Sequence, residues 1–152
     1  MPEIKIRQAD YADPAVRALL VDVFAELAER YGGSGDDTPI ADDDFTPPNG
    51  AFLVADDGER LVACAGWRRH QGDAELKRMF TARAVRGQGL GRRMLAAIEE
   101  SARAAGCPRV ILETGDKQPE AIALYESAGY VRIEDFGYYR GQEGVLSYAK
   151  PV

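Results

Sequence analysis

Cysteine and histidine are scarce in this sequence, and their scarcity excludes several kinds of site. The 152 residues include two cysteines, Cys64 and Cys107, and one histidine, His70. Two cysteines make neither a disulfide framework nor a zinc ligand set, so we expect reduced thiols, a cytoplasmic compartment and no metal. Neither cysteine is paired with a histidine or a basic helix start, the settings that activate a thiolate. Cysteine catalysis is therefore not expected.

Long apolar runs and a basic charge balance are also missing. No apolar stretch approaches the ~20 residues of a membrane helix, and charges begin at residue 3, where a signal peptide would be apolar. The net charge is -6, and residues 1–60 hold 5 Lys and Arg against 14 Asp and Glu. Duplex nucleic acid requires a basic face. We therefore expect neither a membrane nor a nucleic acid as partner.

The length and apolar content fit one domain over residues 1–152, with 45% hydrophobic and 29% charged residues. Apolar periodicity and turn residues predict helices and strands in an α+β order with one mixed sheet. Residues 32–50, rich in Gly, Asp and Pro, predict a long loop. In the helix over 90–105 we expect Glu99 to pair with Arg103. The predicted strands cover 4–8, 51–55, 61–67, 74–81, 110–113, 130–133 and 145–149, and the helices 14–31, 90–105 and 119–128.

A glycine-rich segment, Arg86-Gly87-Gln88-Gly89-Leu90-Gly91, lies between a predicted strand and the start of the strongest amphipathic helix. Glycines let main-chain N–H groups approach a ligand, and a helix N-terminus behind them favours an anion such as a pyrophosphate. The dinucleotide fingerprint fails because Arg92 stands where it needs a small residue, and the Gly-Lys-Ser/Thr of a Walker motif is absent. The segment therefore predicts a phosphate site of another kind.

In this segment and the blocks on either side of it, the sequence resembles the GNAT superfamily of N-acetyltransferases. The glycine segment matches the family's pyrophosphate loop, and the flanking blocks are 74–81 (AELKRMFT) and 121–130 (AIALYESAGY). The resemblance implies an α+β fold with a mixed, mostly antiparallel central sheet splayed between its fourth and fifth strands, and helices on both faces. It also implies an acetyl-CoA-dependent acyltransferase, with acetyl-CoA as the acetyl donor and an amine as the acceptor.

The resemblance assigns roles to residues of three blocks. The main chain of Met79, Phe80 and Thr81 is expected to bond the pantetheine arm. Gln118 stands where the family often has an asparagine that contacts this arm. The full predicted cofactor-binding set is Met79, Phe80, Thr81, Arg86, Gly87, Gln88, Gly89, Leu90, Gly91, Arg92, Gln118 and Tyr125.

Acetyl transfer to an amine needs a proton donor for the leaving thiolate and a way to deprotonate the amine. Tyr125 matches the family tyrosine that serves as general acid. Glu75 stands where some members carry a general base, and Glu113, on the other strand of the gap, is the competitor; either could act through a water, and a surface ion pair is the structural alternative for both.

The acceptor is expected against the first helix, the loop after it and the C-terminal strands. Carboxylates and aromatic rings in these places suit a cationic amine, and a small-molecule primary amine attacked within a ternary complex is the leading prediction. A protein or peptide acetyltransferase and a non-catalytic acetyl-CoA sensor are the alternatives, and monomer and homodimer both stay open. The residues in question are Tyr31, Asp36, Asp37, Asp42, Asp43, Asp44, Phe45, Tyr138 and Tyr139.

Overall fold

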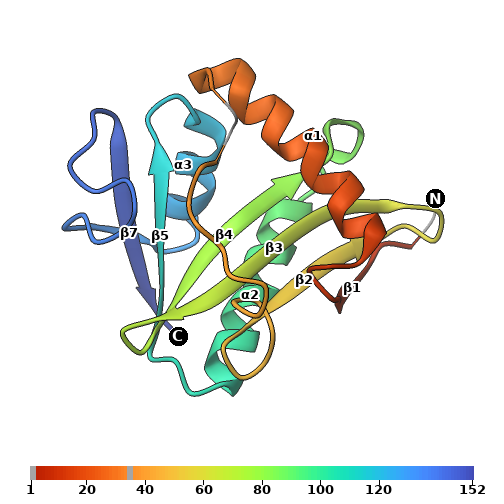
Figure 1. The fold of residues 1–152 in the computed structure, drawn as a ribbon, viewed down its shortest axis with the longest axis horizontal. Helices are drawn as coiled ribbons and strands as arrows, with labels where there is room; N and C mark the ends of the chain where they lie inside the picture. The colour runs from red at the N-terminus through yellow and green to blue at the C-terminus, as the bar shows by residue number, and fades with distance from the viewer. Residues whose placement is uncertain (1–2, 34–35) are drawn as a thin grey trace.

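A computed structural model describes residues 3–33 and 36–152, in which seven strands form one sheet in the order β1-β2-β3-β4-β5-β7-β6 (Figure 1). All neighbouring strands are antiparallel except β4 and β5. The strands are β1 (Lys5–Gln8), β2 (Gly50–Asp56), β3 (Leu61–His70), β4 (Asp73–Thr81), β5 (Arg109–Gly115), β6 (Val131–Ile133) and β7 (Val145–Pro151). The helices are α1 (Pro14–Tyr31), α2 (Leu90–Ala104) and α3 (Pro119–Ser127), with a 3₁₀ turn η1 (Arg83–Val85).

Local sequence explains both ends of α1. The Asp13 side chain accepts a hydrogen bond from the Ala15 main-chain N–H, and Pro14 occupies the first turn, as is typical of helix starts. The helix stops at Gly32, whose φ of 77° lies in the left-handed region that glycine adopts without strain. The predicted limits of this helix are confirmed.

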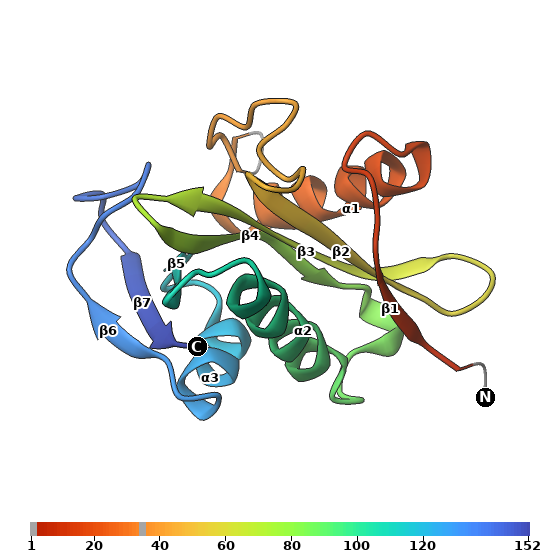
Figure 2. The ribbon, with the colours of Figure 1, turned by 90° about the horizontal axis from the view of Figure 1, so that it is seen from below.

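Helices cover both faces of the sheet, with α1 on one face and α2 and α3 on the other (Figure 2). On the first face Val16 and Val23 of α1 pack with Phe52 of β2 in an apolar cluster. On the second face Met94 and Ile98 of α2 belong to a larger cluster that also includes side chains of β2 to β5. The sheet is therefore buried between two apolar layers, and the site must form at an interruption of these layers.

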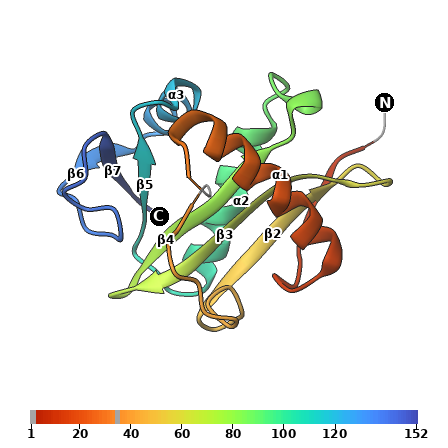
Figure 3. The same cartoon turned by 45° about the horizontal axis from the view of Figure 1, so that its top comes forward.

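That interruption lies between β4 and β5. The two strands pair only at Ala74 with Val110 and at Glu75 with Ile111, and beyond these pairs the ribbons diverge (Figures 1 and 3). The predicted splay between the fourth and fifth strands is confirmed. Because main-chain groups need partners, the edge of β4 beyond Glu75 faces the gap with donors and acceptors that β5 does not satisfy.

A β-bulge bends β4 at this gap. Cys64 of β3 pairs with Phe80 and Gly66 pairs with Lys77, so two residues of β4 stand opposite one residue of β3. Arg78 lies in the bulge with a φ of 59°, a value that non-glycine residues seldom adopt. The Cys64 thiol donates a hydrogen bond to the Arg78 carbonyl at 3.2 Å. Nothing in the strand's apolar alternation predicts this bulge.

Most predicted elements are confirmed, with small shifts at their ends. Residues 36–49 contain neither helix nor strand, as expected of the loop, while 34–35 lie outside the described residues. The ion pair expected between Glu99 and Arg103 is wrong. Glu99 lies on the buried face of α2, where it accepts hydrogen bonds from Tyr130 Oη and Lys150 Nζ, both at 2.9 Å, and Arg103 pairs with Glu100 instead.

Candidate functional site

The glycine loop lies between η1 and α2, and it leaves the start of α2 open. Gly87 and Gly89 have φ values of 81° and 78°, and a Cβ atom at either would have no atom within 4 Å. Gly89 is the N-cap of α2 and has no side chain to bond the first amides. The unpaired N–H groups of this 15-residue helix therefore face the loop, which fits a pyrophosphate.

A cavity of about 500 Å³ lies between this loop, the end of β4, α1 and α3. It is called here the cofactor cavity because the sequence predicts that its lining binds the acetyl donor. The predicted residues Gln88 and Arg92 do not contribute to its lining: Gln88 is exposed, and Arg92 Nη2 donates to the Ser127 hydroxyl at 2.5 Å. The other ten predicted cofactor-binding residues line it, namely Met79, Phe80, Thr81, Arg86, Gly87, Gly89, Leu90, Gly91, Gln118 and Tyr125.

The arginine that begins the glycine segment is already bonded within the protein. Arg86 donates from Nη2 to Glu26 of α1 at 2.6 Å and from Nε to the Thr81 carbonyl at 2.9 Å. Arg83 donates to the same Glu26 carboxylate at 3.3 Å. The hydrogen bond from Arg86 lowers the pKa of Glu26 from its usual value. Glu26 was not predicted from the sequence, because one acidic residue on an amphipathic helix carries no motif.

A second cavity, of about 370 Å³, lies in the gap itself, since residues of both β4 and β5 line it. The two cavities share a wall, which is made by Val23, Leu27, Met79, Gln118 and Tyr125. Of the residues expected to meet the acceptor, Tyr31, Asp36 and Tyr139 line the second cavity. The remaining candidates lie outside its lining, and two have other roles: Phe45 is packed in the core beneath α1, and Asp44 bonds Arg68 at 3.0 Å.

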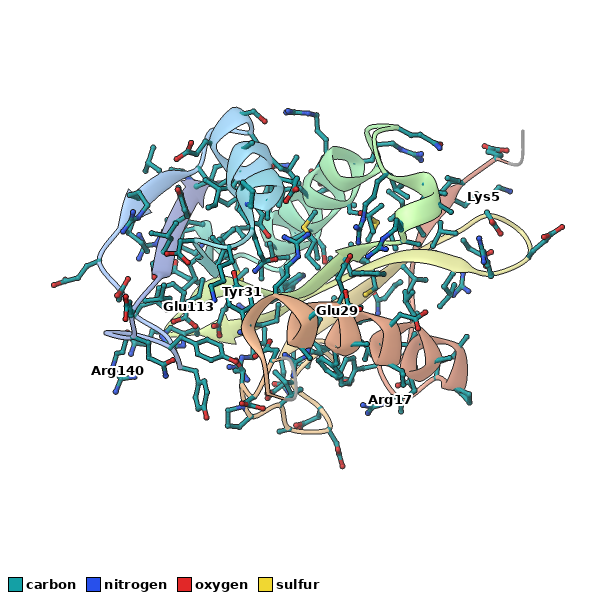
Figure 4. The ribbon with its side chains drawn as sticks, turned by 90° about the horizontal axis from the view of Figure 1, so that it is seen from above. Lys5, Arg17, Glu29, Tyr31, Glu113 and Arg140 are labelled. Atoms are coloured by element: carbon teal, nitrogen blue, oxygen red, sulfur yellow. The ribbon has the colours of Figure 1, made fainter. Side chains whose placement is uncertain are left out.

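Glu113 of β5 lies on the second cavity, close to Tyr31 at the end of α1 (Figure 4). Its Oε2 accepts a hydrogen bond from the Tyr139 main-chain N–H at 3.0 Å, while its Oε1 is buried and has no protein partner among the described residues. Burial raises the pKa of the Glu113 carboxyl above its usual value, against the lowering effects of the Lys77 charge and the Tyr139 hydrogen bond; the negative charges of Glu75 and Asp135 add to the rise. A carboxylate with one satisfied and one free oxygen is suited to accept a proton.

Glu75 has different surroundings. It is 1% exposed, it does not line either cavity described above, and its Oε1 accepts a hydrogen bond from Arg68 Nε at 3.0 Å. Arg68 also bonds Asp44 and the Pro39 carbonyl. Glu75 thus helps to hold the 36–45 segment against β3 and β4.

Tyr125 of α3 is on the wall that the two cavities share. Its hydroxyl makes no hydrogen bond to any other residue in 3–33 or 36–152. Burial raises its pKa to about 12, so the phenol keeps its proton near neutral pH. A protonated hydroxyl with no competing partner can act as a donor at the junction of the cavities.

Asp36 is the centre of a buried polar cluster. From the sequence it was predicted only as a residue that meets the acceptor. Its carboxylate pairs with Arg78, lies 3.6 Å from Lys77 Nζ, and accepts a hydrogen bond from Tyr139 Oη at 2.6 Å. Lys77 Nζ also donates to Thr38 Oγ1 at 2.9 Å. The alternation of Glu75 and Lys77 on one face of a buried strand was the available indication of this cluster.

Two other kinds of feature are absent from the described residues. No three His, Cys, Asp or Glu side chains there come together as a set that could hold a metal ion. None of the helices in residues 3–33 and 36–152 combines the length and the apolar character needed to cross a membrane.

Known proteins resemble this chain along its whole length. An IAA acetyltransferase of Azospirillum brasilense is 33% identical over 155 aligned residues, with 100% of each chain covered. A crystal structure of a putative acyl-CoA N-acyltransferase from Klebsiella pneumoniae superposes with a TM-score of 0.81 at 27% identity, covering 99% of each chain. A GNAT family acetyltransferase from Elizabethkingia anophelis, solved with acetyl-CoA bound, has the same fold, with a TM-score of 0.72 at 14% identity and 100% of both chains covered.

The family follows from these matches. The sequence profile of the acetyltransferase (GNAT) family matches residues 18–130, a span that runs from α1 to the end of the 121–130 block and includes the glycine loop. With a full-length relative beside this match, the chain belongs to the acetyltransferase (GNAT) family, whose acetyl donor is acetyl-CoA.

Proposed function

We propose that this acetyltransferase moves the acetyl group of acetyl-CoA to a small, cationic primary amine by direct attack within a ternary complex. The observation that carries the proposal is the free, buried Oε1 of Glu113 on a cavity that shares a wall with the cofactor cavity. A donor in one cavity and an acceptor in the other would meet at this wall, which is the arrangement that direct transfer requires.

The charge around the second cavity supports a cationic acceptor. Arg68 is bonded to two carboxylates, those of Asp44 and Glu75. Asp36 is bonded to two cations, Lys77 and Arg78. These two clusters offset each other, so within residues 3–33 and 36–152 the charge of Glu113 is left without a direct ion pair. An ammonium group beside Glu113 would complete the balance.

The size of the second cavity supports a small acceptor. About 370 Å³ is within the range of small-molecule pockets. Two residues of its lining, Tyr139 and Asp36, are joined by a hydrogen bond of 2.6 Å between Oη and Oδ1. An extended polypeptide needs an open groove, so the small volume and this contact favour a small amine over a protein substrate.

The chemistry assigned to the chain's residues is a proton removal and a proton donation. Glu113, directly or through a water, takes a proton from the ammonium group, and the neutral nitrogen attacks the thioester carbon. A C–N bond forms and the C–S bond breaks, Tyr125 gives its proton to the leaving thiolate, and the second proton lost by the nitrogen restores the Tyr125 phenol. We assign the base to Glu113 in preference to Glu75, because only Glu113 lies on the cavity and Glu75 is bonded to Arg68.

The test is an assay of CoA release with acetyl-CoA and a panel of small amines, to which IAA is added because the Azospirillum brasilense relative is named for it. Glu113→Gln should lower kcat by roughly 10²–10⁴-fold, the usual worth of a positioned base, with acetyl-CoA affinity unchanged. Glu75→Gln is the matched variant and should lower stability more than rate. Loss of rate in a folded Glu75→Gln protein, with Glu113→Gln active, would return the base to Glu75.

A further inference from the structure

We propose that the turn formed by residues 137–139 positions the Glu113 carboxylate, with Gly137 and Tyr139 as positioning residues for the transfer reaction. The inference rests on the proposed role of Glu113 as the base. The turn lies between β6 and β7, far from Glu113 in sequence, and it contacts both walls of the second cavity.

The first contact is steric and involves Gly137. A Cβ atom at this position would lie 2.4 Å from both Cδ and Oε1 of Glu113, well inside van der Waals contact. The φ of Gly137 is outside the left-handed region, so an alanine would meet no backbone strain there. Glycine at this turn lets the main chain and the carboxylate approach each other so closely.

The second contact is a hydrogen bond from the main chain. The Tyr139 N–H donates to Glu113 Oε2 at 3.0 Å, which fixes the orientation of the carboxyl group. With Oε2 occupied, Oε1 is the oxygen left without a protein partner in the described chain. The turn therefore decides which oxygen of Glu113 is available for proton transfer.

The third contact links the turn to the opposite wall. Tyr139 Oη donates to Asp36 Oδ1 at 2.6 Å and accepts from the Asp37 N–H at 2.8 Å. Asp36 in turn pairs with Lys77 and Arg78 of β4. One residue thus orients the base through its main chain and fixes the facing wall through its hydroxyl, so the two roles can be separated by substitution.

Gly137→Ala tests the first role. The end of the Glu113 side chain is flexible enough to move away from the new methyl group, so the protein should fold, with the carboxylate displaced. Because small displacements of a catalytic group are costly, kcat should fall roughly 10- to 100-fold, and the acidic limb of the pH–rate profile should shift. Acetyl-CoA affinity, measured by calorimetry, should not change, since Gly137 is outside the cofactor cavity. The variant leaves in place the other charged groups that face Glu113, namely Lys77 and Glu75 of β4 and Asp135 of the β6–β7 segment.

A double-mutant cycle separates this inference from the proposed function. If Gly137 acts through Glu113, Gly137→Ala should cost nothing further in kcat when Glu113→Gln is already present. Full activity of Glu113→Gln alone would refute the proposed base. A crippled Glu113→Gln protein beside a fully active Gly137→Ala protein, or additive losses in the double variant, would instead refute the positioning role.

Tyr139→Phe tests the role of the Tyr139 hydroxyl at the facing wall. This test does not require that the protein tolerate a substitution at residue 137. It deletes the hydroxyl and keeps the N–H that bonds Glu113. We expect KM for the acceptor to rise roughly tenfold, with the pH–rate profile of kcat unchanged. Tyr138→Phe is the control, because Tyr138 is 47% exposed and does not line the second cavity. An unchanged KM in Tyr139→Phe, or an equal change in Tyr138→Phe, would overturn the claim that the Tyr139 hydroxyl fixes the facing wall of the second cavity.

Discussion

Glu26 of α1 and Arg86 of the glycine loop are joined by a hydrogen bond of 2.6 Å, so the loop is tied to the helix that covers the opposite end of the gap. Arg83 reinforces the contact from η1. Both Glu26 and Arg86 line the cofactor cavity. The arginine that would assist an anionic donor is therefore shared with a carboxylate on the same cavity.

Substitution of Glu26 should strengthen donor binding. Glu26→Gln removes a negative charge from the cavity and leaves Arg86 free to face phosphate. Because charge interactions near a partly exposed surface are moderate, we expect acetyl-CoA affinity to rise roughly 3- to 10-fold by calorimetry, and the gain to shrink at high salt. Glu29→Gln, on the exposed side of α1, is the control. Weaker binding by Glu26→Gln would mean that the ion pair acts chiefly to hold the loop in place.

A carboxylate placed in the glycine loop should abolish donor binding. Gly89→Asp puts a side chain and a negative charge where we expect the pyrophosphate. Gly58→Asp is a matched control: Gly58 also has a positive φ, 97°, and no atom within 4 Å of its built Cβ, but it lies in the β2–β3 turn. We expect calorimetry to find no acetyl-CoA binding by Gly89→Asp and normal binding by Gly58→Asp. Equal affinity of the two variants would remove the loop assignment.

Removal of the Tyr125 hydroxyl should slow the reaction without weakening donor binding. Tyr125→Phe should reduce kcat by roughly 10²–10⁴-fold. Burial raises the Tyr125 pKa to about 12, so the wild-type rate should show no alkaline limb from this group near neutral pH. Tyr130→Phe is the comparison, since its ring lies 5.9 Å from that of Tyr125 but its hydroxyl bonds Glu99. A fully active Tyr125→Phe protein would mean that water, and not Tyr125, gives the proton to the leaving thiolate.

Loss of the Asp36 charge should destabilise the fold at neutral pH. Burial alone would raise the pKa of Asp36, but Lys77 and Arg78, with hydrogen bonds from Thr38 and Tyr139, lower it well below its usual value. Asp36→Asn leaves two buried cations without their partner, which typically costs about 3–5 kcal/mol of unfolding free energy.

The pH dependence of this loss has a definite sign. A carboxyl group with a lowered pKa in the folded state stabilises the protein above its unfolded pKa of about 4, and that contribution disappears as the pH falls below it. Denaturant unfolding should therefore show the largest difference between wild type and Asp36→Asn near pH 7, and a smaller one below pH ~4. Asp42→Asn, at an exposed neighbouring position, should show neither the loss of stability nor its pH dependence. A difference that does not vary with pH would contradict this account.

The sequence was most informative where a pattern depends on neighbouring residues. Asp13-Pro14 and Gly32 set the limits of α1, and the glycine segment marks the start of α2, because caps and left-handed turns are local. The family, the splayed sheet and acetyl-CoA as donor were predicted from three short blocks, and all are confirmed.

Contacts between distant segments could not be predicted in the same way. Asp36 and Tyr139 are 103 residues apart, and nothing local to either indicates the other. The ranking of Glu75 above Glu113 came from a family position, whereas burial beside Arg68 and exposure to a cavity depend on the tertiary fold. The bulge at Arg78 carries no glycine to mark its positive φ, so its effect on β4 was invisible in the sequence.

Because β4 and β5 pair at only two positions, the free edge of β4 bears on how acetyl-CoA would be recognised. A strand edge offers a repeating series of peptide groups, and the amide bonds of a pantetheine arm can continue that series as a further strand would. We expect recognition of the arm to reside in the topology of the sheet, since the main chain of β4 would supply the contacts whatever its side chains are. For these main-chain contacts the side chains of Met79, Phe80 and Thr81 would matter little, whereas an insertion that closed the gap would remove the donor site entirely.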